Sequence, residues 1–129
     1  YFGSDVVICY KQRKKANVIE SMTLIGDVEG KDIILLDDMV DTAGTLTKAA
    51  DIMMDRGACS VRAMVTHPIL SGQAYERIEK SGLKELITTD SIALKNSSDK
   101  IKVLSCAPLM ADAIKLIEDN ASISAKYIL

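Results

Sequence analysis

Two neighbouring carboxylates and a run of small residues stand close together in this sequence. Asp37 and Asp38 end an apolar run, and residues 42–45 read Thr-Ala-Gly-Thr. Adjacent carboxylates at the end of a strand can hold a hydrated Mg²⁺ ion or accept hydrogen bonds from sugar hydroxyls. Backbone N–H groups at the start of a helix bind phosphate. The combination predicts a pocket for a phosphorylated sugar.

The flanking sequence supplies the elements that this pocket needs. Residues 33–36 read Ile-Ile-Leu-Leu, a run too short for a helix but typical of a strand buried in a parallel sheet. After the small residues, Leu46, Ala49, Ala50 and Met53 follow the i, i+3, i+4, i+7 spacing of a helix. We therefore expect a strand, a tight turn and a helix in that order.

The same alternation of periods continues along the chain. Further strands are expected at 5–10, 60–66, 83–89 and 101–104, a strand or hairpin within 17–27, and helices at 44–56, 72–80 and 110–117. Strands that alternate with helices predict the α/β class, with a mainly parallel sheet covered by helices on both faces. Ligands of such sheets bind at the carboxyl ends of the strands, so the first strand and the central strand can face one pocket.

Composition narrows the class of protein. The chain has 129 residues, 48% hydrophobic content and a net charge of −2, and no stretch is long and apolar enough for a membrane helix. These values predict one globular cytoplasmic domain, or part of one, whose partners are small molecules and other subunits and neither nucleic acid nor membrane. The three cysteines have no metal-binding spacing and are expected to be buried reduced thiols. Because the chain starts at Tyr1, it reads as cut at a domain boundary.

Two other features have more than one interpretation. Lys11, Arg13, Lys14 and Lys15 repel one another and predict a mobile loop, which is either a solvated turn or a flap that stabilises charge on a moving phosphoryl group. His67 is the only histidine and has no evident acid or nucleophile partner in the sequence. A structural or pocket-lining His67 is therefore favoured over a catalytic one.

Four segments resemble one known family. The run DIILLDDMVDTAGT is similar to the phosphoribosyl-binding loop of the type I phosphoribosyltransferase fold, and its three acids resemble most closely those of the ribose-phosphate pyrophosphokinases. The resemblance extends through KQRKKANVI, THPILSG and the terminal SIS. It covers a little under half of a full-length subunit and implies that residues 1–129 form a single C-terminal phosphoribosyltransferase-like domain without the N-terminal ATP-binding half.

The resemblance also implies roles for individual residues. Asp37 and Asp38 would fix the 2- and 3-hydroxyls of ribose, directly or through Mg²⁺. The 5-phosphate would be held by the loop, with Asp41 near ribose or the water shell of the metal; the loop residues are Asp41, Thr42, Ala43, Gly44 and Thr45. Lys11 and Arg13 would neutralise charge on the transferred group. Ser122 and Ser124 would contribute to a regulatory phosphate or ADP site between subunits.

The implied reaction transfers the diphosphate of Mg-ATP to the anomeric hydroxyl of ribose 5-phosphate, which gives phosphoribosyl pyrophosphate and AMP. The fragment alone would bind ribose 5-phosphate weakly and not turn over, and full-length subunits would assemble as dimers stacked into hexamers. Two alternatives remain: a phosphoribosyltransferase that consumes phosphoribosyl pyrophosphate, and a non-catalytic paralogue that regulates the synthetase. A DxDxT phosphatase and a Walker A protein are disfavoured because neither motif occurs in the sequence.

Overall fold

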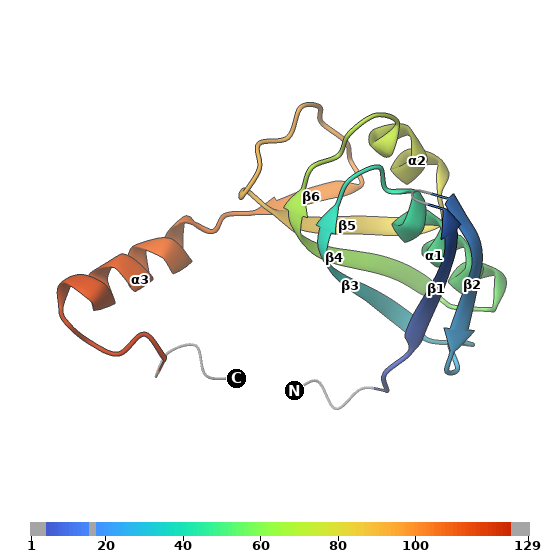
Figure 1. Ribbon diagram of the computed structural model, residues 1–129, viewed down its shortest axis with the longest axis horizontal. Coiled ribbons are helices and arrows are strands. Elements are labelled where there is room, and N and C mark those ends of the chain that lie inside the picture. Colours follow the sequence, from blue (N-terminus) through green and yellow to red (C-terminus); the bar gives the residue numbers. More distant parts are fainter. Residues whose placement is uncertain (1–4, 16–17, 125–129) are drawn as a thin grey trace.

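The computed structural model describes residues 5–15 and 18–124, which contain six strands and three helices (Figure 1). In chain order they are β1 (Ile8–Lys15), β2 (Val18–Ile25), β3 (Asp32–Val40), α1 (Gly44–Asp55), β4 (Ser60–Pro68), α2 (Ala74–Lys80), β5 (Leu83–Thr89), β6 (Ile101–Leu104) and α3 (Ala107–Glu118).

The central sheet has the order β3-β4-β5-β6, and every neighbouring pair is parallel. Alternate residues of β4 point into the core, where Val61, Ala63 and Val65 are buried. The apolar stripe of α1 covers them, with Ala50 and Met53 almost fully buried. The α/β class with a mainly parallel sheet is therefore confirmed.

Helices α1 and α2 cover one face of this sheet (Figure 1). The strands follow the order of the sequence, and right-handed crossovers that all advance in one direction place their helices on the same side. On the other face, apolar side chains stay exposed, with Ile34 54%, Leu36 73% and Leu104 61% accessible. We expected helices on both faces of the parallel sheet. Within the described residues 5–15 and 18–124, helices cover only one of its faces.

Strands β1 and β2 form a separate antiparallel hairpin. Two expectations are corrected here: the cationic segment 11–15 belongs to β1 and is not a loop, and the first strand does not join the parallel sheet. The repulsion between cations predicted a loop, but the backbone of this segment pairs with β2, for example Lys11 with Met22 and Arg13 with Ile19. Pairing with a partner strand thus overrides the local charge pattern.

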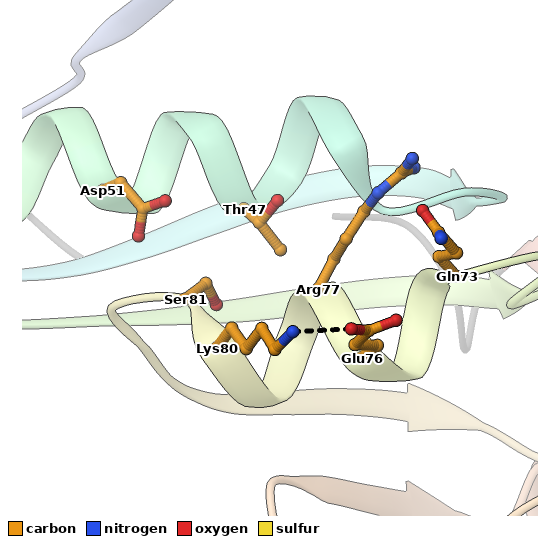
Figure 2. A pocket seen from close by; sticks show the side chains of 7 residues that line it. All are labelled: Thr47, Asp51, Gln73, Glu76, Arg77, Lys80 and Ser81. Carbon is orange, nitrogen blue, oxygen red and sulfur yellow. Dashed lines mark hydrogen bonds and ion pairs between the residues drawn. The ribbon is translucent and has the colours of Figure 1, made fainter.

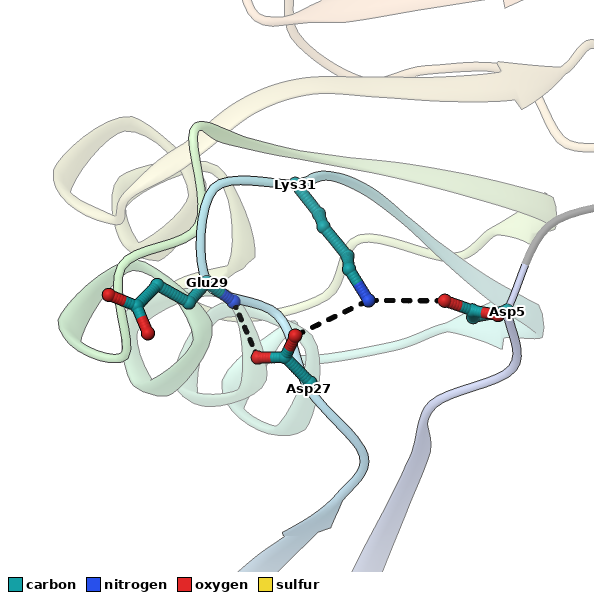
Figure 3. A network of polar contacts seen from close by, with 4 residues as sticks. All are labelled: Asp5, Asp27, Glu29 and Lys31. Carbon is teal, nitrogen blue, oxygen red and sulfur yellow. Dashed lines mark hydrogen bonds and ion pairs between the residues drawn. The ribbon is translucent and has the colours of Figure 1, made fainter.

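A small polar network joins the two ends of the hairpin (Figure 3). The Lys31 ammonium lies 3.1 Å from a carboxylate oxygen of Asp5, before β1, and 3.4 Å from one of Asp27, after β2. The Glu29 N–H donates to the other oxygen of Asp27 at 3.1 Å. That hydrogen bond and the Lys31 cation lower the pKa of Asp27, and the contact with Asp5 raises the pKa of Lys31. The network holds the hairpin base next to the start of β3.

Helix α3 extends away from the sheet and has no buried residue (Figure 1). Its start is tied to the turn after β5, because the Asp90 carboxylate accepts the Cys106 N–H at 2.7 Å and the Ser105 hydroxyl at 2.6 Å. No disulfide joins the three cysteines, all of which lie in the described part of the structure, but the expected burial is wrong. Cys59 is exposed in the turn between α1 and β4, and Cys9 and Cys106 are partly exposed. Among the described residues, no helix has the length and hydrophobicity required to cross a bilayer.

Candidate functional site

The paired acids lie within a strand. β3 continues to Val40, so the expected strand end at Asp37 is wrong by several residues. Both side chains are exposed, and the Asp38 N–H donates to an oxygen of Asp37 at 3.0 Å. Because neighbouring residues of a strand point to opposite faces, the two carboxylates leave β3 on different sides near its carboxyl end.

The turn from β3 to α1 is tight and brings free amides to the helix start. Ala43 is the N-cap residue in the left-handed region, with φ 59°, and α1 begins at Gly44. A left-handed alanine is strained by about 1–2 kcal/mol. Thr47 supports it, since its N–H and its hydroxyl both donate to the Ala43 carbonyl, at 3.0 and 2.9 Å.

Among the residues that the structure describes, no side chain caps this helix start, and no acid lies in the first turn. The first N–H groups of an α-helix have no partner within the helix, and they carry the positive end of the helix dipole. The structure therefore places Thr42, Ala43, Gly44 and Thr45 where the sequence predicted them, at an uncapped helix N-terminus suited to an anion.

Asp41 is held by the loop that follows β4. The Ser71 hydroxyl donates to the Asp41 carboxylate, and the Ser71 N–H donates to the Asp41 carbonyl at 3.0 Å. The Leu70 N–H bonds the Val40 carbonyl at 3.1 Å in the same way. One oxygen of this acid thus has a structural partner, which turns it toward the neighbouring loop.

Arg77 is a residue of this site that the sequence analysis did not identify. Its side chain extends from α2 toward the start of α1 (Figure 2). There its Nη1 donates to the Thr42 carbonyl at 2.8 Å. A Cβ atom added at Gly44 would lie 3.5 Å from the same nitrogen. The 35 positions between Arg77 and Thr42 explain why no local pattern indicated the contact.

A polar pocket of about 310 Å³ lies between α1 and α2 (Figure 2). It is lined by Thr47, Asp51, Gln73, Glu76, Arg77, Lys80 and Ser81. None of the predicted site residues whose side chains are described lines it. Arg77 lines this pocket and also contacts Thr42, so the predicted loop lies beside the pocket.

His67 lies at the carboxyl end of β4, opposite Met39 of β3 in the register. Its Nδ1 is 2.9 Å from the Ser91 hydroxyl oxygen, which also donates to the Thr66 carbonyl at 3.0 Å. A serine whose proton is directed to a carbonyl accepts from the imidazole, so this contact ties His67 to the turn after β5; a structural or pocket-lining role for His67 stays a prediction.

The other predicted residues are spread over the chain. Lys11 and Arg13 lie on β1, but their side chains are outside the described part of the structure. Ser122 and Ser124 are exposed, beyond the end of α3 and apart from the loop. Among the described residues, no group of three or more His, Cys, Asp or Glu side chains could hold a metal ion. Binding of Mg²⁺ by Asp37 and Asp38 stays a prediction, and because these carboxylates leave β3 on opposite faces, one ion could reach both only through water or substrate oxygens.

Comparison with known proteins gives the family. The model of the phosphoribosyl synthetase-associated domain matches residues 7–128, nearly the whole chain. The chain belongs to this family. Members of the phosphoribosyl synthetase-associated family include longer proteins, and the chain is similar to several of them. It is 53% identical over 126 residues to a ribose-phosphate pyrophosphokinase of Wolinella succinogenes, a match that covers 98% of this chain and 41% of that protein.

A ribose-phosphate pyrophosphokinase of Helicobacter hepaticus is 55% identical over 125 residues, with 97% of this chain and 40% of that protein covered. In three dimensions the chain resembles the crystal structure of phosphoribosylpyrophosphate synthetase from Mycobacterium smegmatis, with a TM-score of 0.73 and 38% identity over 78% of this chain and 35% of that one. The resemblance to ribose-phosphate pyrophosphokinases is thus confirmed. The chain spans about two fifths of the length of these curated relatives and corresponds to their C-terminal portion.

Proposed function

We propose that this chain is the ribose 5-phosphate-binding portion of a ribose-phosphate pyrophosphokinase. The observation that carries the proposal is the uncapped start of α1, which directly follows the strand that bears Asp37 and Asp38. Membership of the phosphoribosyl synthetase-associated family supports the same reading.

The 5-phosphate of the sugar would accept hydrogen bonds from the N–H groups at the loop and first turn, with the hydroxyls of Thr42 and Thr45 as further donors. Asp37 and Asp38 would bind the ribose hydroxyls. Because these carboxylates leave β3 on opposite faces, a sugar that contacts both must lie at the carboxyl edge of the sheet. This is the edge at which the loop begins, so one ligand can span both groups. Asp41 completes this edge and is oriented by Ser71.

Lys11 and Arg13 would act on the group in transfer, because cations lower the energy of a transition state in which charge spreads over phosphoryl oxygens. The co-substrate would be Mg-ATP, whose metal ion would neutralise charge on the phosphates. Asp37 and Asp38 are the residues of this chain that would hold that ion. The reaction is diphosphate transfer to the anomeric hydroxyl of ribose 5-phosphate, with AMP as the second product.

The chain alone covers about two fifths of its relatives, so we expect it to bind ribose 5-phosphate weakly and not to turn over. The proposal places the whole protein in the cytoplasm as a homo-oligomer, dimeric or hexameric. Ser122 and Ser124, exposed after α3, would lie at a regulatory phosphate or ADP site of that assembly.

A chimera tests this function. The 129 residues would replace the matching region of the Wolinella succinogenes relative, and ³¹P NMR would follow ATP, Mg²⁺ and ribose 5-phosphate. We expect formation of AMP and phosphoribosyl pyrophosphate, and a strong loss of turnover in K11A and R13A versions of the chimera. A folded but inactive chimera would indicate the regulatory paralogue. Consumption of phosphoribosyl pyrophosphate with a free base would indicate the phosphoribosyltransferase.

A further inference from the structure

The peptide group between Thr42 and Ala43 has its orientation set from outside the loop. Its carbonyl oxygen, on Thr42, accepts the Arg77 Nη1–H at 2.8 Å. A trans peptide group is planar, and its C=O and N–H point in opposite directions. There is no cis peptide bond among the residues that the structure describes. With the carbonyl turned toward α2, the Ala43 N–H is turned away from α2.

Helix α2 is a firm base for this contact. It is only seven residues long, and so short a helix is unstable by itself. Its carboxyl end is fixed by Lys100, whose ammonium donates to the carbonyls of Ile78, Glu79 and Ser81 at 3.2, 2.9 and 3.0 Å. Ile78 itself is fully buried. The Cα of Arg77 therefore has a fixed position relative to the loop.

We propose that Arg77 is a positioning residue for the phosphate-binding loop, and this rests on the function proposed above. Arg77 holds the Thr42 carbonyl so that the Ala43 N–H, next to the Gly44 and Thr45 amides, faces the 5-phosphate. It acts through Thr42 and not by contact with the ligand. The left-handed backbone of Ala43 makes such support necessary, because this conformation is strained for a residue with a Cβ.

The chain offers a matched control. Arg56, at the other end of α1, also donates from Nη1 to a backbone carbonyl, that of Leu24 at 3.3 Å. The substitutions R77A and R56A therefore remove the same charge and the same kind of hydrogen bond, but only R77A touches the loop. R77K keeps the charge and replaces the planar guanidinium by a single ammonium.

The first measurement is calorimetric titration of the four proteins with ribose 5-phosphate. Without Arg77, only a fraction of the molecules would have the Ala43 N–H turned toward the phosphate before binding, so we expect R77A to weaken binding about tenfold, which corresponds to about 1.4 kcal/mol. R56A should bind like the wild type, and R77K should recover part of the loss. Binding by R77A equal to that of the wild type would overturn the proposal.

The second measurement needs no ligand. In ¹⁵N-¹H NMR spectra, the Ala43 amide resonance should move in R77A and stay in place in R56A. If the wild type does not bind ribose 5-phosphate, the function proposed for this chain fails, and the Ala43 resonance still tests the positioning. An unchanged Ala43 resonance in R77A would refute it. A second outcome would also refute the positioning role. If R77K binds ribose 5-phosphate like the wild type while its Ala43 resonance has moved as in R77A, a positive charge at position 77 would be enough for binding and the orientation of the amide would not matter.

Discussion

Gly44 offers a substitution that should separate ligand binding from stability. It is the first residue of α1, and its φ is not positive, so alanine can adopt its backbone conformation. An added Cβ would lie 3.5 Å from Arg77 Nη1 and 3.9 Å from the Thr42 hydroxyl oxygen, both ordinary contacts. Alanine is favoured over glycine in a helix by about 0.5–1 kcal/mol. G44A should therefore fold with equal or slightly greater stability.

The same methyl group should prevent the ligand from docking. A phosphate oxygen bound by backbone amides sits about 2.9 Å from each nitrogen, which leaves no room for a methyl group on the adjacent Cα. We expect G44A to lose ribose 5-phosphate binding by more than tenfold, which corresponds to about 1.4 kcal/mol. Urea unfolding measures the stability and calorimetric titration measures the binding.

Gly30 provides the opposite control. Its φ is +68°, and apart from Gly30 itself and its two chain neighbours, no heavy atom of the described residues lies within 4 Å of an added Cβ, so the substitution Gly30→Ala introduces strain without a clash. It should lower the stability by about 1 kcal/mol and leave ligand binding unchanged. If G44A binds like the wild type, or if G30A loses binding as G44A does, the assignment of the loop to phosphate is refuted.

Two further predictions concern stability. The Thr88 hydroxyl is buried with no hydrogen-bond partner among the described residues. T88V should therefore raise the free energy of unfolding, measured with urea, by about 1 kcal/mol. A free energy of unfolding below that of the wild type would contradict this. The N–H of Cys106 and the hydroxyl of Ser105 lower the pKa of the Asp90 carboxyl in the folded protein. The stability that this carboxylate contributes is therefore complete above the usual aspartate pKa, and it is lost as the pH falls through the lowered pKa of the folded state. The Cys106 amide resonance should report a midpoint below the usual aspartate range, and D90N should lack this transition; a midpoint at or above that range would be inconsistent with the hydrogen bonds.

The spacing of apolar residues along the chain was enough to predict several helices and strands, because their bounds depend on the nearby sequence. The bounds expected for the strands at 83–89 and 101–104 agree with β5 and β6, and the helix expected at 44–56 agrees with α1 to one residue. The order of strand, turn and helix at the site was also predicted, because an apolar run, small residues and a helical spacing are all read within about 20 positions.

Features that depend on distant partners could not be predicted. The strand β1 forms because β2 pairs with it, and the bare face of the sheet results from the strand order, which no local window contains. The contacts of Arg77 with Thr42 and of Ser71 with Asp41 join segments 35 and 30 positions apart. Arg77 looks like an ordinary polar position in the sequence, and Ser71 stands in the segment THPILSG without any indication of its partner. Their meaning appears only when α2 and the loop after β4 lie against the start of α1.

The central claim is that the end of β3 and the start of α1 together bind ribose 5-phosphate. Its most direct test is calorimetric titration of the wild-type chain with ribose 5-phosphate and, separately, with ribose. We expect heat with ribose 5-phosphate, much less with ribose, and none with ribose 5-phosphate in the double variant D37N/D38N. Equal heats for the two sugars, or unchanged binding by D37N/D38N, would contradict it.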